Sequence, residues 1–420
     1  MNQARNRSDA HILIAGAGIG GLGAALALGQ LGKNCDIEIT VLEQADVFGE
    51  VGAGVQISPN AYQVLCAWGL ADALNQTANF PQRLQVRSAA SHQLLGELAL
   101  GDKAVSRYGC PFATLHRADL HRLLLDAVRQ LPNVTLHLNA KIAKISETNQ
   151  QVSVTTASGE RFSADVLIGA DGLRSRVRPH VIDDDHPNPT GHTAWRALIS
   201  LAHLADLAEV PPEILQDLLQ DQVTAWLAPD SHTIAYPVQQ GKSLNLVFCV
   251  ENKDKNELHP AHLLPNQLSK VLQSVFKIAT EKHAWTRWDL FDRPPLKSAT
   301  QMANPAHPRI ALLGDAAHPM LPYLAQGAAM ALEDAQALAL SVQNVVQKNP
   351  NDVPSALQIY AQTRWQRNAK VQTRATQNGE IFHAKPPISW ARDAAMGLLG
   401  EKLLDMPWLY GYASPVKSTF

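Results

Sequence analysis

Three glycines near the N-terminus, followed by one acidic residue, have the spacing of a dinucleotide-binding motif. Gly16, Gly18 and Gly21 separate a short apolar run from an Ala/Leu-rich segment, which predicts a strand, a tight turn and a helix. Gly16 permits the sharp turn, Gly18 lets the backbone approach a pyrophosphate, and Gly21 lets helix and strand pack closely. Glu43 ends a second apolar run, where its carboxylate can accept hydrogen bonds from a ribose.

The glycine motif alone leaves two alternatives open. A second frame, formed by Gly18, Gly20 and Gly23, also fits the pattern, although the strand ending at Ala15 favours the first frame. A glycine-rich contact between helix and strand, with nothing bound, would use the same residues. Strand, helix, second strand and acidic residue together favour the dinucleotide site.

Arg117 stands at the start of a predicted helix whose apolar positions follow a 3.6-residue period. A cation is poorly placed at the positive end of a helix dipole, so we expect Arg117 to face an anion or a hydrogen-bond acceptor. The alternative is an ordinary surface arginine.

The elements that must position these residues fall into two patterns. Strands alternate with helices at the start of the chain, and residues 309–313 predict a further buried parallel strand. Between residues 193 and 288, strand candidates follow one another with one amphipathic helix near 263–278, which predicts an inserted mixed or antiparallel sheet. A long Ala-rich helix is expected at 326–346, and residues 354–412 are expected to be mainly helical.

Two local signals make finer predictions. Residues 162–168 read as one strand. Ser58 and Pro59 predict a helix start, with Ser58 as the N-cap residue and Pro59 at the first helical position.

Composition limits the class of protein. The chain has 420 residues, more than one ordinary core, so we expect two or three sub-domains. A formal net charge of -2 gives no basic excess for nucleic acid or an anionic membrane. The N-terminus is polar, and no uninterrupted apolar run is long enough to span a membrane. The four cysteines are scattered, so we expect reduced packing residues, no metal site and a cytoplasmic protein.

Four stretches together resemble a known family. They are residues 16–21 with Glu43, the helix start at Arg117, residues 171–178 and residues 314–319. Their order and spacing are similar to the single-component FAD-dependent aromatic hydroxylases of the p-hydroxybenzoate-hydroxylase fold, over nearly the whole chain. Residues 48–61 and 408–412 resemble the branch that contains salicylate 1-hydroxylase, 3-hydroxybenzoate 6-hydroxylase and 6-hydroxynicotinate 3-monooxygenase.

The resemblance implies an α/β fold with a Rossmann-like FAD-binding domain, an inserted mixed-sheet substrate domain and C-terminal helices. The implied boundaries are 1–75, 101–180 and 292–345 for the discontinuous FAD-binding domain, 76–100 and 181–291 for the substrate-binding domain, and 346–420 for the helical region.

The resemblance also implies how the cofactors bind. Asp315 would accept a hydrogen bond from the ribityl hydroxyls of FAD, although a carboxylate there could instead cap the following turn. Asp171 and Val55 would lie at the cofactor cleft, and the helix near Gln326 would aim its positive end at the flavin. Because no second glycine motif is present, NADH or NADPH would bind transiently over the flavin.

The implied reaction is hydroxylation of a small aromatic acid. NAD(P)H would reduce FAD, O2 would form a flavin C4a-hydroperoxide, and an ionised phenol would attack its distal oxygen. His232 and Tyr236 lie two alternations apart on one strand face, where a histidine with an ordinary pKa near ~6.5 suits a general base. A strand-face histidine is often only a core or edge residue. Gln326 would contact substrate, and Arg196 would bind its carboxylate or form a structural pair.

Among substrates, we expect a salicylate-like acid, hydroxylated with loss of CO2. The alternatives are a 3-hydroxybenzoate 6-hydroxylase or 6-hydroxynicotinate 3-monooxygenase type of activity. A flavoprotein of the same fold with another substrate, or a non-catalytic flavin-binding sensor, also fits the motifs. The sequence is compatible with a monomer or a homodimer.

Overall fold

The computed structural model describes residues 10–33, 36–49, 53–183, 186–200, 222–251, 259–282, 284–349 and 352–412. The glycine motif belongs to a five-stranded parallel sheet with the order β17-β11-β1-β2-β7. Its strands are β1 (Ala10–Ala15), β2 (Ile37–Leu42), β7 (Val134–His137), β11 (Val166–Gly169) and β17 (Ile310–Leu312). The three central strands are almost entirely buried, as expected of a parallel sheet covered on both faces.

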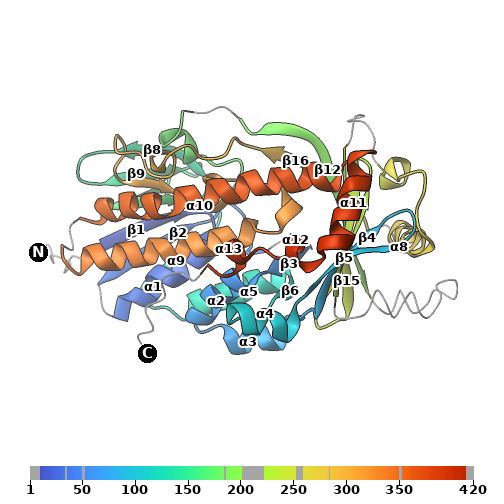
Figure 1. Ribbon diagram of the computed structural model, residues 1–420. Coiled ribbons are helices and arrows are strands. Elements are labelled where there is room, and N and C mark those ends of the chain that lie inside the picture. The colour runs from blue at the N-terminus through green and yellow to red at the C-terminus, as the bar shows by residue number, and fades with distance from the viewer. Residues whose placement is uncertain are drawn as a thin grey trace, which may run out of the picture.

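Helices pack closely around the glycine motif. Helix α1 (Ile19–Gly29) follows β1 and contacts both α5 (Arg117–Arg129) and α9 (Gly327–Val346). Gly23 permits the close approach of α9, because a Cβ there would lie 3.3 Å from Leu332. Helix α10 (Val353–Phe382) runs beside α9 along much of the molecule (Figure 1). Helix α9 confirms the long helix that was predicted at 326–346.

A second sheet contains seven strands in the order β16-β12-β15-β14-β13-β4-β5. Its strands are β4 (Arg83–Ser88), β5 (Leu94–Ala99), β12 (Asn188–Ser200), β13 (Gln222–Ala228), β14 (Ser231–Val238), β15 (Ser243–Glu251) and β16 (Thr286–Asp292). Strands β13 and β4 are parallel and the other neighbours are antiparallel, so the predicted mixed sheet is confirmed.

One helix packs on this second sheet and begins later than predicted. Helix α8 (Lys270–Glu281) places Phe276 edge-on against Phe248 of β15, with ring centroids 5.1 Å apart. The expected start near residue 263 is wrong, because a separate 3-10 turn occupies Pro260–Leu263. Ser269 caps the helix by accepting a hydrogen bond from the backbone of Leu272.

The segment 162–168 is two strands rather than the single strand predicted. Strand β10 (Arg161–Ala164) pairs with β9 (Val152–Thr156) in a small antiparallel sheet, whereas β11 joins the parallel sheet. The chain changes sheets at Asp165, whose side chain accepts a hydrogen bond from the backbone of His11. The remaining elements of this half are β3 (Gly54–Ile57), β6 (Ala113–His116), β8 (Ile142–Glu147), α2 (Pro59–Ala67), α3 (Ala71–Thr77) and α4 (Gly101–Tyr108).

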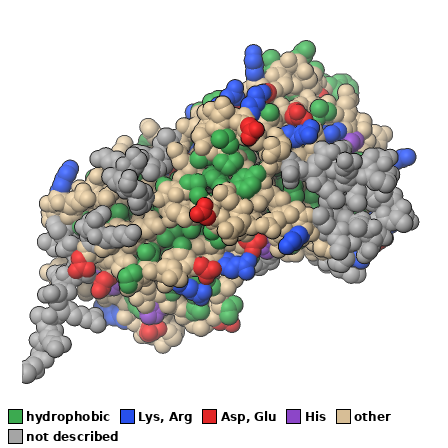
Figure 2. Space-filling model, turned by 90° about the horizontal axis from the view of Figure 1, so that it is seen from below, with side chains coloured by type: hydrophobic (Ala, Val, Ile, Leu, Met, Phe, Trp, Pro, Cys, Tyr) green, Lys and Arg blue, Asp and Glu red, His purple; other side chains and the backbone are tan. Residues whose placement is uncertain are grey.

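The C-terminal part is mainly helical, as predicted. After α10 come α11 (Ile388–Leu399), α12 (Glu401–Leu404) and α13 (Pro407–Tyr410), and the first two of these contact β5 (Figure 1). In the described parts of the chain, no helix is long and apolar enough to cross a bilayer. Figure 2 shows acidic and basic side chains interspersed around hydrophobic ones on one face.

Candidate active site

The glycine turn has the geometry that its spacing predicts. Gly16 has φ +96°, and a Cβ there would lie 2.6 Å from the carbonyl oxygen of Ala170. A Cβ on Gly21 would lie 1.9 Å from the carbonyl oxygen of Gly16, so both positions require glycine for packing. A Cβ on Gly18 would meet no atom of the described residues within 4 Å. Gly18 is therefore free of packing constraints and faces space that a ligand can fill.

Glu43 stabilises this turn as well as standing at its edge. Its carboxylate accepts hydrogen bonds from the backbone of Ala17 at 2.7 Å and of Ala45 at 2.9 Å. The side chain is half-buried, at the end of β2, where it was expected. A hydrogen bond from Glu43 to a ribose stays a prediction.

A cavity of about 300 Å³ lies between the parallel sheet and the seven-stranded sheet. It brings together eight of the predicted site residues, namely Gly18, Val55, Arg117, Arg196, His232, Tyr236, Asp315 and Gln326. Gly16, Gly21, Glu43 and Asp171 do not line it. Residues 50–52 of the segment that resembles the salicylate-hydroxylase branch lie outside the described part of the chain.

The loop that carries Asp315 is held from behind by Arg178. The buried guanidinium of Arg178 donates hydrogen bonds to the carbonyl oxygens of Ala316 and Ala317, at 2.8 and 2.7 Å. The carboxylate of Asp315 makes no hydrogen bond to any described residue, so it does not cap the turn. It projects into the cleft, where surrounding protein raises its pKa while His318 and Arg117 oppose that rise.

Asp171 was predicted to lie at the cofactor cleft, and its contact with the cofactor stays a prediction. Its carboxylate accepts a hydrogen bond from the Ser175 hydroxyl at 2.6 Å and two from the backbone amides of Arg176 and Val177. Burial raises the pKa of Asp171, and these hydrogen bonds oppose that rise. The side chain therefore builds its own loop, and the neighbouring Ala170 and Gly172 line the cavity instead.

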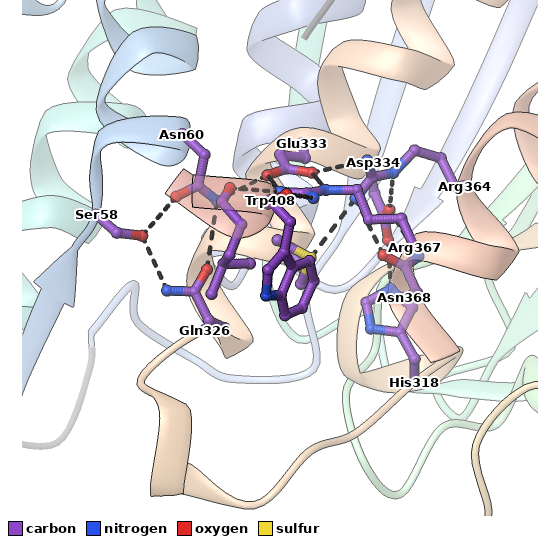
Figure 3. A network of polar contacts seen from close by, with 12 residues as sticks. Ser58, Asn60, His318, Gln326, Glu333, Asp334, Arg364, Arg367, Asn368 and Trp408 are labelled. Atoms are coloured by element: carbon purple, nitrogen blue, oxygen red, sulfur yellow. Dashed lines mark hydrogen bonds and ion pairs between the residues drawn. The ribbon is translucent and has the colours of Figure 1, made fainter. Parts of the chain in front are cut away.

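A buried network of charges anchors the Asp315 loop to the long helices (Figure 3). Arg364 of α10 donates to Asp334 and to Glu333 of α9, each at 2.7 Å. Asp334 also contacts the His318 ring and accepts a hydrogen bond from the backbone of Gly314. Burial alone would raise the pKa of Asp334, but His318 and Arg364 outweigh it and hold the pKa below its usual range. His318 thus links the Asp315 loop to α9 through Asp334.

The same network fixes Gln326, the residue before α9. Its amide nitrogen donates to the Ser58 hydroxyl at 2.9 Å, and its amide oxygen accepts from Asn60 (Figure 3). Asn60 also donates to Glu333 at 2.7 Å. Ser58 has the backbone position of a helix N-cap, but its side chain forms no capping hydrogen bond, because Gln326 and Asn60 occupy its hydroxyl.

The opposite wall of the cavity belongs to the seven-stranded sheet. His232, Ile234 and Tyr236 of β14 all line the cavity, so the expected shared strand face is confirmed. The Tyr236 ring lies against Gly54, where a Cβ would be 2.6 Å from the ring. Burial raises the pKa of the Tyr236 phenol, so it stays protonated at neutral pH.

Arg196 is a largely enclosed cation on this wall. Its guanidinium lies over the ring of Trp288, 5.0 Å from the centroid. Its Nε is buried and has no hydrogen-bond partner among the described residues. Burial lowers the pKa of Arg196, and the nearby Arg117 acts in the same direction. The alternative role for Arg196 was a structural pair. Among the described residues, Arg196 contacts a tryptophan ring and has no carboxylate partner.

The environment of His232 overturns the ordinary pKa expected for it. His232 is 2% exposed, and its Nδ1 lies 2.7 Å from Nε2 of His383, at the end of α10. Burial, then His383 and His192, lower the pKa of His232 well below its usual value, so the ring is neutral at pH 7. Sequence reasoning missed His383 because nothing local marks it.

Comparisons with known proteins agree with this architecture. Residues 9–375 match the family model described as an FAD binding domain. The chain is 36% identical to 3-hydroxybenzoate 6-hydroxylase 1 of Aquipseudomonas alcaligenes over 96% of this chain and 97% of that protein. It is 34% identical to 3-amino-4-hydroxybenzoate 2-monooxygenase PtmB3 of Streptomyces platensis over 97% of both chains. A solved salicylate hydroxylase substrate complex has the same fold, with a TM-score of 0.76 at 24% identity over 97% of this chain and 96% of that one.

The residues of the cleft fit FAD, because Gly18 leaves open space at the start of α1 and Asp315 offers a carboxylate that no described residue hydrogen-bonds. A match over most of the chain, together with full-length relatives, settles the family. The chain belongs to the FAD binding domain family, as an FAD-dependent aromatic monooxygenase.

Proposed function

We propose that this enzyme hydroxylates a monohydroxybenzoate whose carboxylate binds Arg196. The observation that carries the proposal is the state of Arg196, which is enclosed in the cavity wall without a described carboxylate partner. A desolvated guanidinium is costly unless an anion pairs with it, and a planar carboxylate suits its fork of donors. The apolar neighbours Ile234, Val247 and Leu321 offer surfaces for one aromatic ring.

The other polar groups of this wall suit the phenol end of such a substrate. His232 is neutral and offers a ring nitrogen as proton acceptor, and Tyr236 keeps its O–H as a donor. Gln326, held by Ser58 and Asn60, is a fixed substrate contact at the end of α9. FAD, when bound, supplies the oxygen-transfer chemistry, at the expense of NAD(P)H and O2.

Cofactor binding is proposed for the residues of the opposite wall. Gly18 and Glu43 would hold the pyrophosphate and the adenosine half of FAD, and Val55, Arg117 and Asp315 would hold the flavin half. We further propose that residues 76–100 and 181–291 form the substrate-binding part, since their strands share the seven-stranded sheet.

For the substrate itself, 3-hydroxybenzoate is the first candidate, because a relative of that activity is 36% identical over nearly both full chains. Oxygen would enter para to the hydroxyl and the carboxylate would be retained. Salicylate is the second candidate, favoured by the resemblance of residues 48–61 to the salicylate-hydroxylase branch. Attack at its carboxyl-bearing carbon would release CO2.

A panel of the three monohydroxybenzoates and 6-hydroxynicotinate tests the proposal. Purified enzyme is supplied with NADH or NADPH, and oxygen uptake, CO2 and product identity are recorded. We expect one dihydroxybenzoate per NAD(P)H and O2 from 3-hydroxybenzoate. CO2 and catechol from salicylate would select the second candidate, and hydrogen peroxide alone from every acid would contradict both.

A further inference from the structure

A second cavity adjoins the first one along the seven-stranded sheet, and we call it the apolar chamber. It has a volume of about 450 Å³ and is bordered by β4 and β13 of the sheet and by α10, α11 and α12. Its walls include Val86, Ala225, Phe382, Ala395, Met396 and Leu404. The two cavities share Gln56, Ile234, Pro322, Ala325 and Gln326. The apolar chamber therefore begins where the substrate wall of the first cavity ends.

Strand pairing places one row of side chains along both cavities. Directly paired residues of neighbouring strands point to the same face of a sheet. The row crosses β12, β15, β14, β13 and β4 in that order and consists of Arg196, Val247, Ile234, Ala225 and Val86. Neighbouring strands lie about 4.8 Å apart, so the row spans roughly 19 Å. A cation stands at one end of it, and every later position is apolar.

The proposed ligands of the first cavity leave the apolar chamber unfilled. Gly18, Arg117 and Asp315, which are proposed to hold FAD, line the first cavity and not the chamber. A cavity of about 150 Å³ is enough to hold a benzene molecule, so the chamber has room for roughly three such rings. A simple hydroxybenzoate held by Arg196 would therefore leave this apolar surface without packing contacts.

The polar groups of the chamber are largely occupied within the protein. Asn378 and Arg392 donate hydrogen bonds to backbone carbonyl groups, and Gln326 donates to Ser58 at 2.9 Å. Arg374 is half-buried, so its charged head can stay in water. The chamber therefore suits an apolar ligand, because a polar one would lose its hydration without gaining hydrogen bonds.

We propose that the preferred substrates are hydroxybenzoates that carry a linear alkyl chain on the ring carbon opposite the carboxylate. This inference rests on the proposed function, since it takes the carboxylate to be held by Arg196. With the carboxylate there, the opposite ring position points along the row of side chains towards Ala225 and Val86. The chain then fills the apolar chamber, and the phenol stays beside His232 and Tyr236.

The far end of the chamber reaches the molecular surface. Ile388 of α11 lines the chamber and is 67% exposed. A chain can therefore extend towards α11 without meeting a closed wall. This geometry favours a long, narrow substituent over a compact one.

A chain-length series tests the proposal on the holoenzyme. The acids are 3-hydroxybenzoate and its 4-methyl, 4-propyl and 4-pentyl derivatives, or the same series of salicylates if the panel selects salicylate. In both series the 4-position is opposite the carboxylate. NAD(P)H oxidation gives kcat and KM, and the products are identified.

Two substitutions on α11 locate the chain. Ala395→Trp introduces an indole ring at a half-buried position of the chamber wall. Ala394→Trp places the same ring on the exposed neighbour outside the chamber and is the matched control. Long-chain and methyl acids are compared within each variant, so a general loss of activity does not affect the result.

We expect kcat/KM of the wild type to rise roughly three- to fourfold for each methylene until the chain fills the chamber. The gain should come from KM, because the chain is bound equally in the ground state and the transition state. In Ala395→Trp the pentyl acid should lose roughly 10-fold or more of its advantage over the methyl acid, whereas Ala394→Trp should keep it.

Three results would overturn the inference. The first is a wild type that uses the pentyl acid no better than the methyl acid, a result that needs no variant to fold. The second is an equal loss of the chain-length gain in both variants, which would place the chain outside the chamber. The third is tight binding of long-chain acids with hydrogen peroxide as the only product, which would make them inhibitors. Turnover of the unsubstituted acid in any of these cases would leave the proposed function intact, whereas no turnover of any acid would contradict that function.

Discussion

The two polar regions beside the cavity differ in how their charges are satisfied. In the network of Figure 3, Arg364 is fully buried and contacts Glu333 and Asp334 directly. On the substrate wall, Arg196 lies over a tryptophan ring and has no carboxylate partner among the described residues. Proteins seldom leave a desolvated cation without a partner. The completed network therefore serves the fold, and the incomplete one is where the proposed function places the carboxylate of the substrate.

The largest expected effect comes from breaking the completed network. Arg364→Met leaves two buried carboxylates short of a partner, which should lower the free energy of unfolding by about 3–5 kcal/mol. Urea denaturation of the holoenzyme measures this loss. Arg196→Met is the matched control, and it should change stability by less than about 1 kcal/mol, because no buried anion is abandoned. Equal losses in the two variants would erase the distinction between the regions.

The next effect tests the incomplete region directly. Arg196→Met should weaken binding of a hydroxybenzoate roughly 10- to 100-fold, since a charge-assisted hydrogen bond contributes about 1.5–3 kcal/mol. Quenching of flavin fluorescence by the acid measures the affinity. Arg287→Met, on the neighbouring strand and outside the cavity, should bind like wild type. Unchanged affinity in Arg196→Met would place the carboxylate elsewhere.

A similar contrast applies to the cofactor wall. Asp315→Ala removes a carboxylate that forms no hydrogen bond with the described residues, so the fold should persist while FAD affinity falls, by about 1–3 kcal/mol. Flavin content after gel filtration and equilibrium titration of the apoprotein report the loss. Asp126→Ala, a surface carboxylate paired with Arg129, should retain FAD fully. If Asp315→Ala binds FAD as tightly as wild type does, Asp315 is not a ligand.

The smallest effect concerns His383 and pH. The pKa of His383 is about 4 when folded and near 6.5 when unfolded, so the unfolded state binds more protons between these values. Stability should be constant in this respect above pH 6.5 and should decrease as pH falls towards 4. Between pH 7 and 5.5, wild type should lose about 1 kcal/mol more than His383→Gln. Parallel pH profiles in thermal unfolding would contradict the low pKa.

Features that depend on local periodicity could be predicted from the sequence. The turn at Gly16, the parallel strand before Asp315 and the shared face of His232 and Tyr236 all follow from spacing over a few residues. The hydroxyl of Ser58 could not be assigned in this way. Its local signature is that of a helix cap, but Gln326, 268 residues away, takes that hydroxyl in the folded chain.

The chemistry of His232 was out of reach for the same reason. Its partner His383 lies 151 residues away in sequence, at the end of a helix. Periodicity predicts that helix but not the place where it packs. The pKa of His232 depends on burial and on two further histidines, which are properties of the assembled site. The sequence could therefore suggest only the ordinary pKa of a histidine.

Helix α10 has a consequence for how this chain can change in length. Arg364 and His383 lie on its course, one in the charge network and the other against His232, separated by about 28 Å along the axis. One residue inserted between them would rotate the two side chains relative to each other by about 100°. Exposed positions in this stretch can be substituted freely, but insertions and deletions there would misalign one contact or the other. Length variation among relatives of this chain should therefore be confined to loops outside α10.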